Sequence, residues 1–147
     1  MKINTLSLSA LLAISLILSS CSGSKFMSKA PATLSNEDKV VYFEFNSAEL
    51  DSEYKSQIKK KVARWIEENP VSKVVIEGHC DERGTREYNK KLGYKRANAV
   101  KDLLVKYGVE ASKIKVISYG EDKPAVKGSN EEAWEQNRRA VTVTFTK

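Results

Sequence analysis

The sequence predicts an α+β fold in which helices pack on one face of a mixed sheet. Short segments in which apolar and polar residues alternate indicate strands, and longer segments with apolar residues every three or four positions indicate helices. These segments follow one another in the order strand, helix, strand, helix, strand, short helix, strand. With 147 residues, the chain has room for one domain and little more.

The first part of this domain should contain one strand and one helix. In residues 40–45 apolar and polar residues alternate, as they do in a half-exposed strand. Asp51 or Ser52 can cap a helix that ends near Asn69, because Pro70 cannot continue it. The apolar side of this helix should comprise Tyr54, Ile58, Val62, Trp65 and Ile66.

The second part should contain three strands and two helices. The apolar run within residues 73–77 indicates a strand, and residues 78–84 should form a loop. A long helix begins near Thr85 and ends at Tyr107, before Gly108, which readily adopts the left-handed conformation of a helix end. The remaining elements are a strand over 114–119, a short helix over 131–137 and a strand over 141–145.

The N-terminus has the build of a bacterial export signal. Lys2 is the only charge before Lys25, and residues 6–18 are apolar apart from serines. Two serines then precede Cys21, a pattern that resembles the bacterial lipobox. This resemblance implies that residues 1–20 are removed and that Cys21 carries lipid. A plain cleaved signal and an uncleaved anchor are the alternatives, but both leave Cys21 unexplained.

Residues 21–37 should form the lipidated cysteine and a flexible tether, and residues 38–147 the folded domain. The tether contains small and polar residues without an apolar period, and as a coil it would span roughly 20–25 Å. Ser22, rather than Asp, follows the lipid site, which by resemblance favours the outer membrane. With Cys21 lipidated, Cys80 has no disulfide partner, and we expect a buried free thiol.

The composition argues against several functions. The net charge of +6 permits an acidic partner, but export and the lack of a basic segment with interleaved aromatic residues argue against nucleic acid. The single histidine has no evident partner for catalysis, so we expect no enzyme activity. No second histidine is available to complete a usual zinc set, and we expect no metal or other cofactor.

The long helix carries an arginine in its apolar stripe. Arg96 lies four residues after Leu92 and four before Val100, and Asn89 falls on the same side. Burying an unpartnered guanidinium is costly. Either the stripe reaches solvent here or Arg96 has an anionic partner, for which a bidentate carboxylate is well suited. An internal salt bridge or a solvated side chain would satisfy the pattern equally well.

The loop between Gly78 and Gly84 is the other candidate site. Its His79, Cys80 and Asp81 could suggest a metal site or a Cys–His nucleophile, but consecutive residues rarely converge on one atom. A binding loop is the better interpretation. In it, Asp81 is an exposed carboxylate offered to a cation, and amides at the start of the next helix are offered to an anion.

Five motifs along the chain carry a specific resemblance. They are Gly78–Thr85, Glu87-Tyr88-Asn89, Leu92-Gly93 with Arg96–Val100, Ser118–Gly120 with Lys123-Pro124, and Asn137–Val141. In this order they resemble the outer-membrane protein A-like domain family, which implies a β-α-β-α-β-β sandwich. With the lipobox and tether, the whole chain resembles the lipid-anchored members of the Tol–Pal system.

In that family the ligand is the stem peptide of uncrosslinked peptidoglycan, bound at its zwitterionic diaminopimelate. The resemblance implies that Asp81 binds the ammonium and Arg96 the carboxylate, while Asn89 orients them or touches the stem. Asn46 stands where the family usually has Asp, near the same pocket. His79 would brace the loop, and Gly93 stands where many relatives carry Ser.

The function implied by the resemblance is that of a non-catalytic anchor. Such a protein sits in the outer membrane through its lipid, holds peptidoglycan, binds the periplasmic propeller protein TolB, and supports envelope integrity and cell division. A wall-binding lipoprotein or adhesin outside the Tol–Pal system is the alternative.

Overall fold

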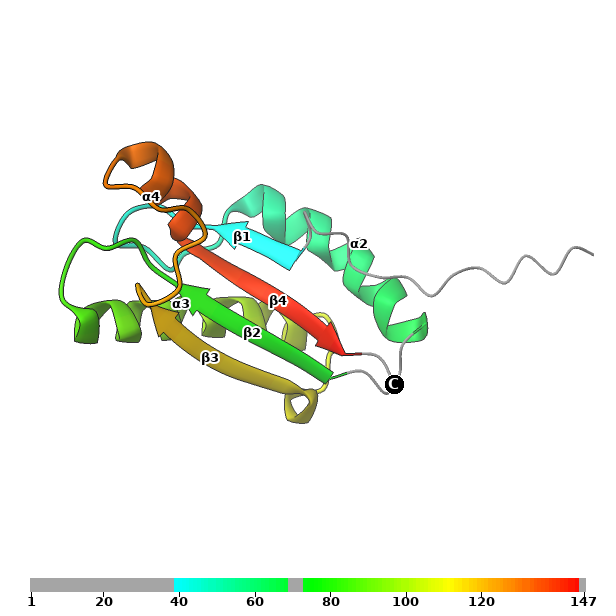
Figure 1. Ribbon diagram of the computed structural model, residues 1–147. Coiled ribbons are helices and arrows are strands. Elements are labelled where there is room, and N and C mark those ends of the chain that lie inside the picture. Colours follow the sequence, from blue (N-terminus) through cyan, green and yellow to red (C-terminus); the bar gives the residue numbers. More distant parts are fainter. Residues whose placement is uncertain (1–38, 69–72, 146–147) are drawn as a thin grey trace, which may run out of the picture.

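The computed structural model describes residues 39–68 and 73–145 (Figure 1). The expected export signal, Cys21 and the tether lie outside the described residues. The elements are β1 (Val40–Tyr42), α2 (Ser52–Glu68), β2 (Lys73–His79), α3 (Arg86–Lys106), the 3₁₀ turn η1 (Ala111–Lys113), β3 (Ile114–Gly120), α4 (Glu131–Asn137) and β4 (Arg139–Phe145).

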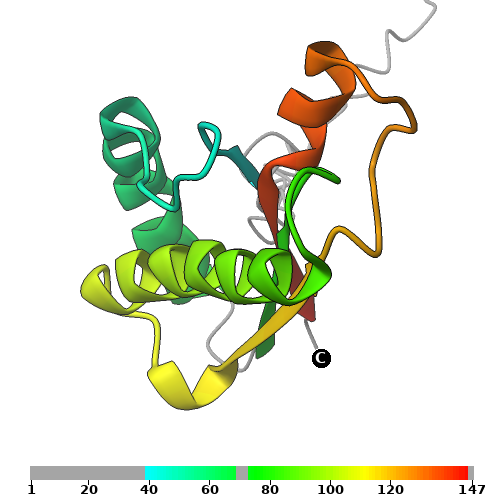
Figure 2. The ribbon, with the colours of Figure 1, turned by 90° about the vertical axis from the view of Figure 1, so that its left-hand side faces the viewer.

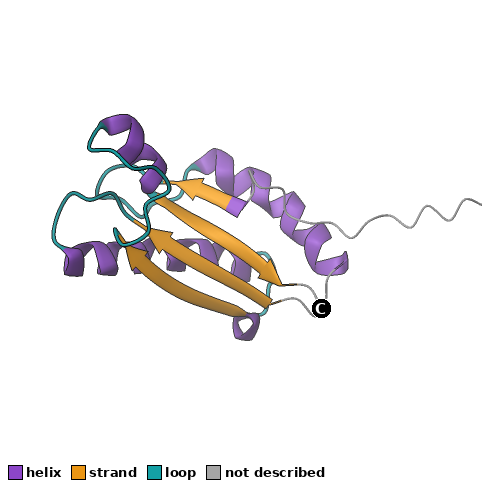
Figure 3. Ribbon diagram, in the orientation of Figure 1, coloured by secondary structure: helices purple, strands orange, loops and turns teal. Residues whose placement is uncertain are grey.

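The strands form one mixed sheet in the order β1-β4-β2-β3 (Figure 3). β4 is antiparallel to both β1 and β2, whereas β2 and β3 are parallel. α2 and α3 lie on the same side of the sheet, and α4 lies beyond the end at which β4 begins (Figure 2). The predicted α+β class, with helices on one face of a mixed sheet, is therefore confirmed.

The hydrophobic core lies between this face and the two long helices. On the sheet, Val74 and Ile76 are almost fully buried because alternate residues of β2 point toward the helices. The helices contribute Ile58, Trp65, Ala97, Val100, Leu103 and Leu104, and Tyr54 packs against this cluster. The side chains of Val62 and Ile66, also expected here, lie outside the described part of α2.

Two glycines bring α3 unusually close to β2. A Cβ atom on Gly78 would lie 1.8 Å from the carbonyl oxygen of Gly93, and one on Gly93 would lie 2.5 Å from Oγ of Ser118. Neither position has room for a side chain. This contact sets the N-terminal half of α3 directly over the end of β2, where the candidate site lies.

The helix boundaries agree closely with the sequence. Thr85 caps α3, since its hydroxyl accepts a hydrogen bond from the Tyr88 amide. Asp51 caps α2 by accepting bonds from the amides of Glu53 and Tyr54. The short helix over residues 131–137 is confirmed.

The predicted first strand is too long. β1 ends at Tyr42, and only the Phe43 amide continues its pairing, by donating to the Arg138 carbonyl at 2.9 Å. The chain then turns through Asn46, which adopts the left-handed conformation with φ of 55°, and Phe45 is left 58% exposed. Alternation in sequence does not reveal this turn. Conversely, β2 continues through Gly78 and His79, which the sequence placed in a loop, because both residues pair with β3. β4 begins at Arg139, two residues before the expected start, because Arg139 and Ala140 pair with β1.

Candidate binding site

A cavity of about 390 Å³ lies at the end of the sheet where β1 and β2 finish. Its walls are formed by Phe45, Asn46, Cys80, Asp81, Arg83, Gly84, Tyr88, Asn89, Leu92 and Arg96. The four residues predicted from the sequence, Asn46, Asp81, Asn89 and Arg96, thus line one cavity. They come from three segments, namely the loop after β1, the loop after β2 and the first turns of α3.

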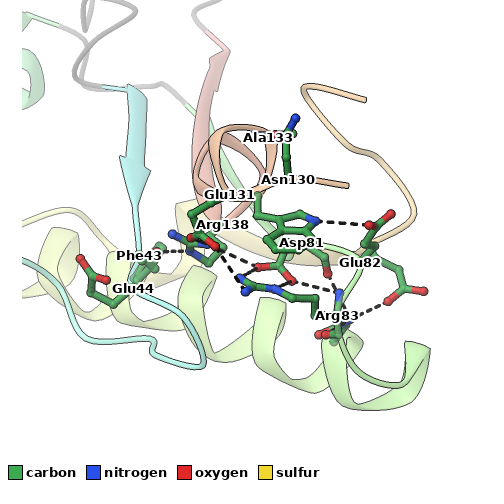
Figure 4. A network of polar contacts seen from close by, with 12 residues as sticks. Phe43, Glu44, Asp81, Glu82, Arg83, Asn130, Glu131, Ala133 and Arg138 are labelled. Carbon is green, nitrogen blue, oxygen red and sulfur yellow. Dashed lines mark hydrogen bonds and ion pairs between the residues drawn. The ribbon is translucent and has the colours of Figure 1, made fainter. Parts of the chain in front are cut away.

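Asp81 is buried, contrary to the expectation of an exposed loop carboxylate. The residue is 4% exposed. Its Oδ1 accepts bonds from the amide and Nε of Arg83 at 3.0 and 3.2 Å, and its Oδ2 accepts one from Nη2 of Arg83 at 2.7 Å. Nη1 of Arg138 lies 3.6 Å from the same Oδ2 (Figure 4). The loop folds inward because these two guanidiniums compensate the buried charge.

The environment keeps Asp81 charged. Burial alone would raise the pKa of its carboxyl, but hydrogen bonds from the side chain and backbone of Arg83 lower it, as do the charges of Arg83 and Arg138. The net pKa lies below its ordinary value. Asp81 is therefore an anion at neutral pH that can bind a cation.

Arg83 was not singled out from the sequence. Its guanidinium lies between the rings of Phe45 and Trp134, 4.2 and 4.1 Å from their centroids. Nη1 also reaches Oε2 of Glu131 on α4 at 3.4 Å. Its position two residues after Asp81 is the only sequence signal for its pairing with that carboxylate. Trp134 and Glu131 are distant in sequence and reach Arg83 only in the folded domain.

Arg96 is buried at 1% exposure, and its partners differ from those expected. Nε donates to the carbonyl oxygen of Ser47 at 2.8 Å, Nη1 to that of His79 at 2.9 Å, and Nη2 to that of Glu44 at 3.1 Å. The stripe therefore neither reaches solvent nor pairs Arg96 with a carboxylate. Main-chain carbonyls instead accept the hydrogen bonds of the Arg96 guanidinium. These bonds link the loop after β1 to the end of β2.

The charge of Arg96 remains available to the cavity. Burial lowers the pKa of its guanidinium, but an arginine stays protonated at neutral pH. The three bonds use three of its five N–H donors. One wall of the cavity thus carries a positive charge and another carries the carboxylate of Asp81.

Asn89 and Asn46 shape the cavity from two sides. Nδ2 of the buried Asn89 donates to the carbonyls of Asp81 and Arg83 at 3.2 and 3.1 Å, and to Oε2 of Glu121 at 2.5 Å. Asn89 therefore holds the loop that carries Asp81. Asn46 lies exposed at the rim, where its Oδ1 accepts a hydrogen bond from the hydroxyl of Tyr88.

His79 and Cys80 are buried beside the site. The His79 ring stacks on Tyr119 with centroids 5.4 Å apart and does not line the cavity, while its carbonyl accepts the bond from Arg96. Cys80 is 3% exposed and its Sγ donates to the Asn89 carbonyl. Burial raises the pKa of this thiol to about 11, so it is unreactive, and the expectation of a buried free thiol is confirmed.

The described residues hold neither a cluster of metal-binding side chains nor a helix suited to cross a membrane. Within 39–68 and 73–145, no group of three or more His, Cys, Asp or Glu side chains could hold a metal ion. In the same ranges, no helix combines the length and apolar character that crossing a membrane would require.

Comparison with known proteins identifies the family. A model of the OmpA family matches residues 42–138. The peptidoglycan-associated lipoprotein of Haemophilus influenzae is 47% identical over 110 residues, or 75% of this chain and 71% of that protein. The peptidoglycan-associated lipoprotein of Pasteurella multocida is 49% identical over 102 residues, or 69% of this chain and 67% of that protein.

Solved structures agree with this assignment. The crystal structure of the peptidoglycan-associated lipoprotein from Burkholderia pseudomallei matches with a TM-score of 0.69 and 38% identity, covering 73% of this chain and 90% of that one. The C-terminal domain of Helicobacter pylori MotB shares the fold, with a TM-score of 0.66 at 23% identity, over 74% of this chain and 84% of that one. The chain belongs to the OmpA family, and peptidoglycan-associated lipoproteins are among its homologues.

Proposed function

We propose that this domain binds the uncrosslinked stem peptide of peptidoglycan at the side chain of diaminopimelate. The observation that carries the proposal is the cavity of about 390 Å³, which has the carboxylate of Asp81 and the guanidinium of Arg96 in its walls. A ligand end that carries both an ammonium and a carboxylate would match these two charges. The names of the homologous lipoproteins support the same ligand class.

In this proposal each wall has its own role. Asp81 accepts hydrogen bonds from the ammonium, and Arg96 donates to the carboxylate through its remaining N–H groups. Phe45, Tyr88 and Leu92 supply apolar surface for the methylene groups that join this doubly charged end to the peptide backbone. Binding forms and breaks no covalent bond, so the proposed site is non-catalytic.

The ligand assignment can be tested by comparing two stem tripeptides by calorimetry. One contains meso-diaminopimelate and the other L-lysine, which keeps the ammonium and lacks the carboxylate. Losing one half of a charge-assisted pair costs on the order of 2–5 kcal/mol, so the lysine peptide should bind at least roughly tenfold more weakly. Equal affinity for the two peptides would contradict the role of Arg96.

We further propose that Cys21 carries a lipid that anchors the protein to the outer membrane, with the domain in the periplasm. The pattern of residues around Cys21 and the homologous lipoproteins support this. The Cys21→Ala variant should fail to incorporate a palmitate analogue and should no longer float with outer membrane. Continued labelling of the variant would refute the assignment.

The anchor would act within the Tol–Pal system, with TolB as a periplasmic partner and a role in envelope integrity and cell division. A pull-down of residues 21–147 with purified TolB distinguishes this from a wall-binding lipoprotein or adhesin outside that system. Capture of TolB supports the first proposal. Failure to capture TolB, together with intact peptidoglycan binding, supports a wall-binding lipoprotein or adhesin outside the Tol–Pal system.

A further inference from the structure

Two arginines of the protein already pair with the carboxylate of Asp81, to which the proposed ligand would bind. Both oxygens of Asp81 accept bonds from Arg83, and Arg138 lies 3.6 Å from Oδ2. An incoming ammonium must therefore share these oxygens or replace one of the two guanidiniums. The inference that follows rests on the proposed function, because it concerns how the same carboxylate receives its ligand.

The two arginines are held very differently. The side chain of Arg138 is only 6% exposed, and its Nε donates to the Phe43 carbonyl at 2.9 Å while its Nη1 donates to Oε1 of Glu131 at 2.8 Å. Leaving its place would break bonds on two sides. The side chain of Arg83 is 29% exposed and lies in the cavity wall, with its bonds to Asp81 as its main anchor.

The surroundings of Arg83 also provide a second position for its charge. Its Nη1 is already 3.4 Å from Oε2 of Glu131, whose side chain is 55% exposed and whose Oε1 is held in place by Nη1 of Arg138 at 2.8 Å. The rings of Phe45 and Trp134 flank the guanidinium and can remain stacked on it while it rotates. A shift from Asp81 to Glu131 keeps Arg83 paired with a carboxylate throughout.

We propose that Arg83 is a displaceable cover on Asp81 that selects for a cationic ligand. The ligand ammonium replaces Arg83 on the oxygens of Asp81, and Arg83 then pairs with Glu131 alone, so that Asp81 and Arg83 each keep a partner of opposite charge. A neutral ligand group carries no charge to compensate that of Asp81, so it does not displace the guanidinium of Arg83 from Asp81. Arg83 is thus a specificity-determining residue that competes with the correct ligand and excludes the wrong one.

The affinity of variants for the diaminopimelate tripeptide tests this competition. Partly exposed ion pairs are worth up to about 1 kcal/mol, so Arg83→Gln should bind roughly three- to fivefold more tightly than wild type. Arg86→Gln is the matched control, because Arg86 also pairs with a carboxylate, that of Asp122, but lies outside the cavity. The affinity of Arg86→Gln should equal that of wild type.

The role of Glu131 is tested by a double-mutant cycle. Glu131→Gln removes the alternative partner of Arg83, so this variant should bind more weakly than wild type by roughly two- to fivefold. In the Arg83→Gln background the same change should have little effect on affinity, because there is no Arg83 guanidinium to move from Asp81 to residue 131. An equal loss in both backgrounds would mean that Glu131 acts through Arg138 instead and would overturn this part of the proposal.

A measurement on the unaltered protein covers the case in which Arg83→Gln does not fold. In an NMR titration with the same tripeptide, the Nε–H signal of Arg83 should shift and exchange faster with water as the bond to Asp81 opens. A signal that stays unchanged at saturation would overturn the proposal.

Failure of this inference and failure of the proposed function give different results. If wild type binds the tripeptide and Asp81→Asn does not, while Arg83→Gln binds more weakly than wild type, Arg83 is a direct ligand contact and the cover is refuted. If wild type and Asp81→Asn bind alike, or neither binds, the proposed function fails and the cover fails with it.

Discussion

Three main-chain carbonyls hold the guanidinium of Arg96, and they belong to segments that are far apart in sequence. Ser47 and Glu44 lie in the loop after β1, while His79 ends β2. Replacing Arg96 with Met would remove this donor from the buried His79 carbonyl and from the partly buried carbonyls of Ser47 and Glu44, at about 1–3 kcal/mol for each group that water cannot reach. Arg96 therefore supports the walls of the cavity as well as its charge.

We expect Arg96→Met to lower the free energy of unfolding in urea by roughly 3–5 kcal/mol. Asp81→Asn keeps the shape of the side chain and should cost less. The proposed contact between Arg96 and the ligand carboxylate can therefore be tested only with an Arg96 variant that remains folded. An Arg96→Met domain as stable as wild type would contradict this account of its three bonds.

His79 should make the stability of the domain depend on pH. Burial first, and then the charges of Arg139 and Lys123, lower the pKa of its imidazole to about 4. An unfolded chain binds the proton with a pKa of 6.5, so between pH 6.5 and 4 the unfolded state binds more protons than the folded state. Stability is therefore complete above pH 6.5 and falls as the pH decreases toward 4.

A shift of this size corresponds to about 3 kcal/mol once the pH is below 4. The measurement is the free energy of unfolding at pH 7 and at pH 4.5, for wild type and for His79→Phe, which can keep the stack on Tyr119. The variant should lose most of this dependence. Asp81 adds little to this difference between pH 7 and pH 4.5. Its pKa in the folded state lies below the ordinary value of 3.8, so its contribution to the free energy of unfolding is lost only at lower pH. Parallel curves for the two proteins would exclude His79 as the cause.

Some site residues were predictable because a local pattern marks them. Arg96 interrupts an apolar helical stripe, Asn89 lies on the same side of that helix, and Asp81 lies in a loop bracketed by glycines. Arg83 and Arg138 could not be found in this way. Their role comes from a buried carboxylate that two distant segments approach, and no periodicity in the sequence encodes that approach.

At the scale of elements, the contact between α3 and β2 sets the geometry of the site. Ser118 fills the space beside Gly93, and its Oγ is fixed by donating to the Lys90 carbonyl at 2.7 Å and accepting from the Gly120 amide at 3.2 Å. In this chain the oxygen of Ser118 already occupies that space.

Gly93→Ala should therefore destabilise the domain, although Ala is normally favoured over Gly within a helix by about 1 kcal/mol. The new Cβ would lie 2.5 Å from Oγ of Ser118, and overpacking of this kind costs typically 1–3 kcal/mol. Adding Ser118→Ala removes the clashing oxygen and should recover part of the loss. Denaturant unfolding of the two single variants and the double variant measures this coupling. A Gly93→Ala protein more stable than wild type would be inconsistent with so close a contact.

Element order and helix ends were predictable, whereas strand ends were not. Capping side chains and Gly108 mark helix ends locally, as Thr85 does for α3. Strand ends depend on partners. Val40 to Tyr42 pair with β4, but the chain turns away through Asn46 while the apolar alternation continues to Phe45.

At the scale of the whole molecule, the chain enters the sheet at Val40 and reaches the cavity just beyond the end of β1. β1 and β2 are both antiparallel to β4 and therefore run in the same direction. Beyond their C-terminal ends follow Asn46 and Asp81 at the cavity, while Val40, at the start of β1, pairs with Val141 near the beginning of β4.

The most direct test of the central claim is sedimentation of the purified domain with peptidoglycan sacculi. Three proteins should be compared: wild type, Asp81→Asn and Asp122→Asn, the last being a carboxylate paired with Arg86 outside the cavity. Because Asp81 supplies the negative charge in the proposed site, Asp81→Asn should weaken binding by roughly tenfold or more, and Asp122→Asn should pellet like wild type. If folded Asp81→Asn pellets as well as wild type, the cavity is not the peptidoglycan site.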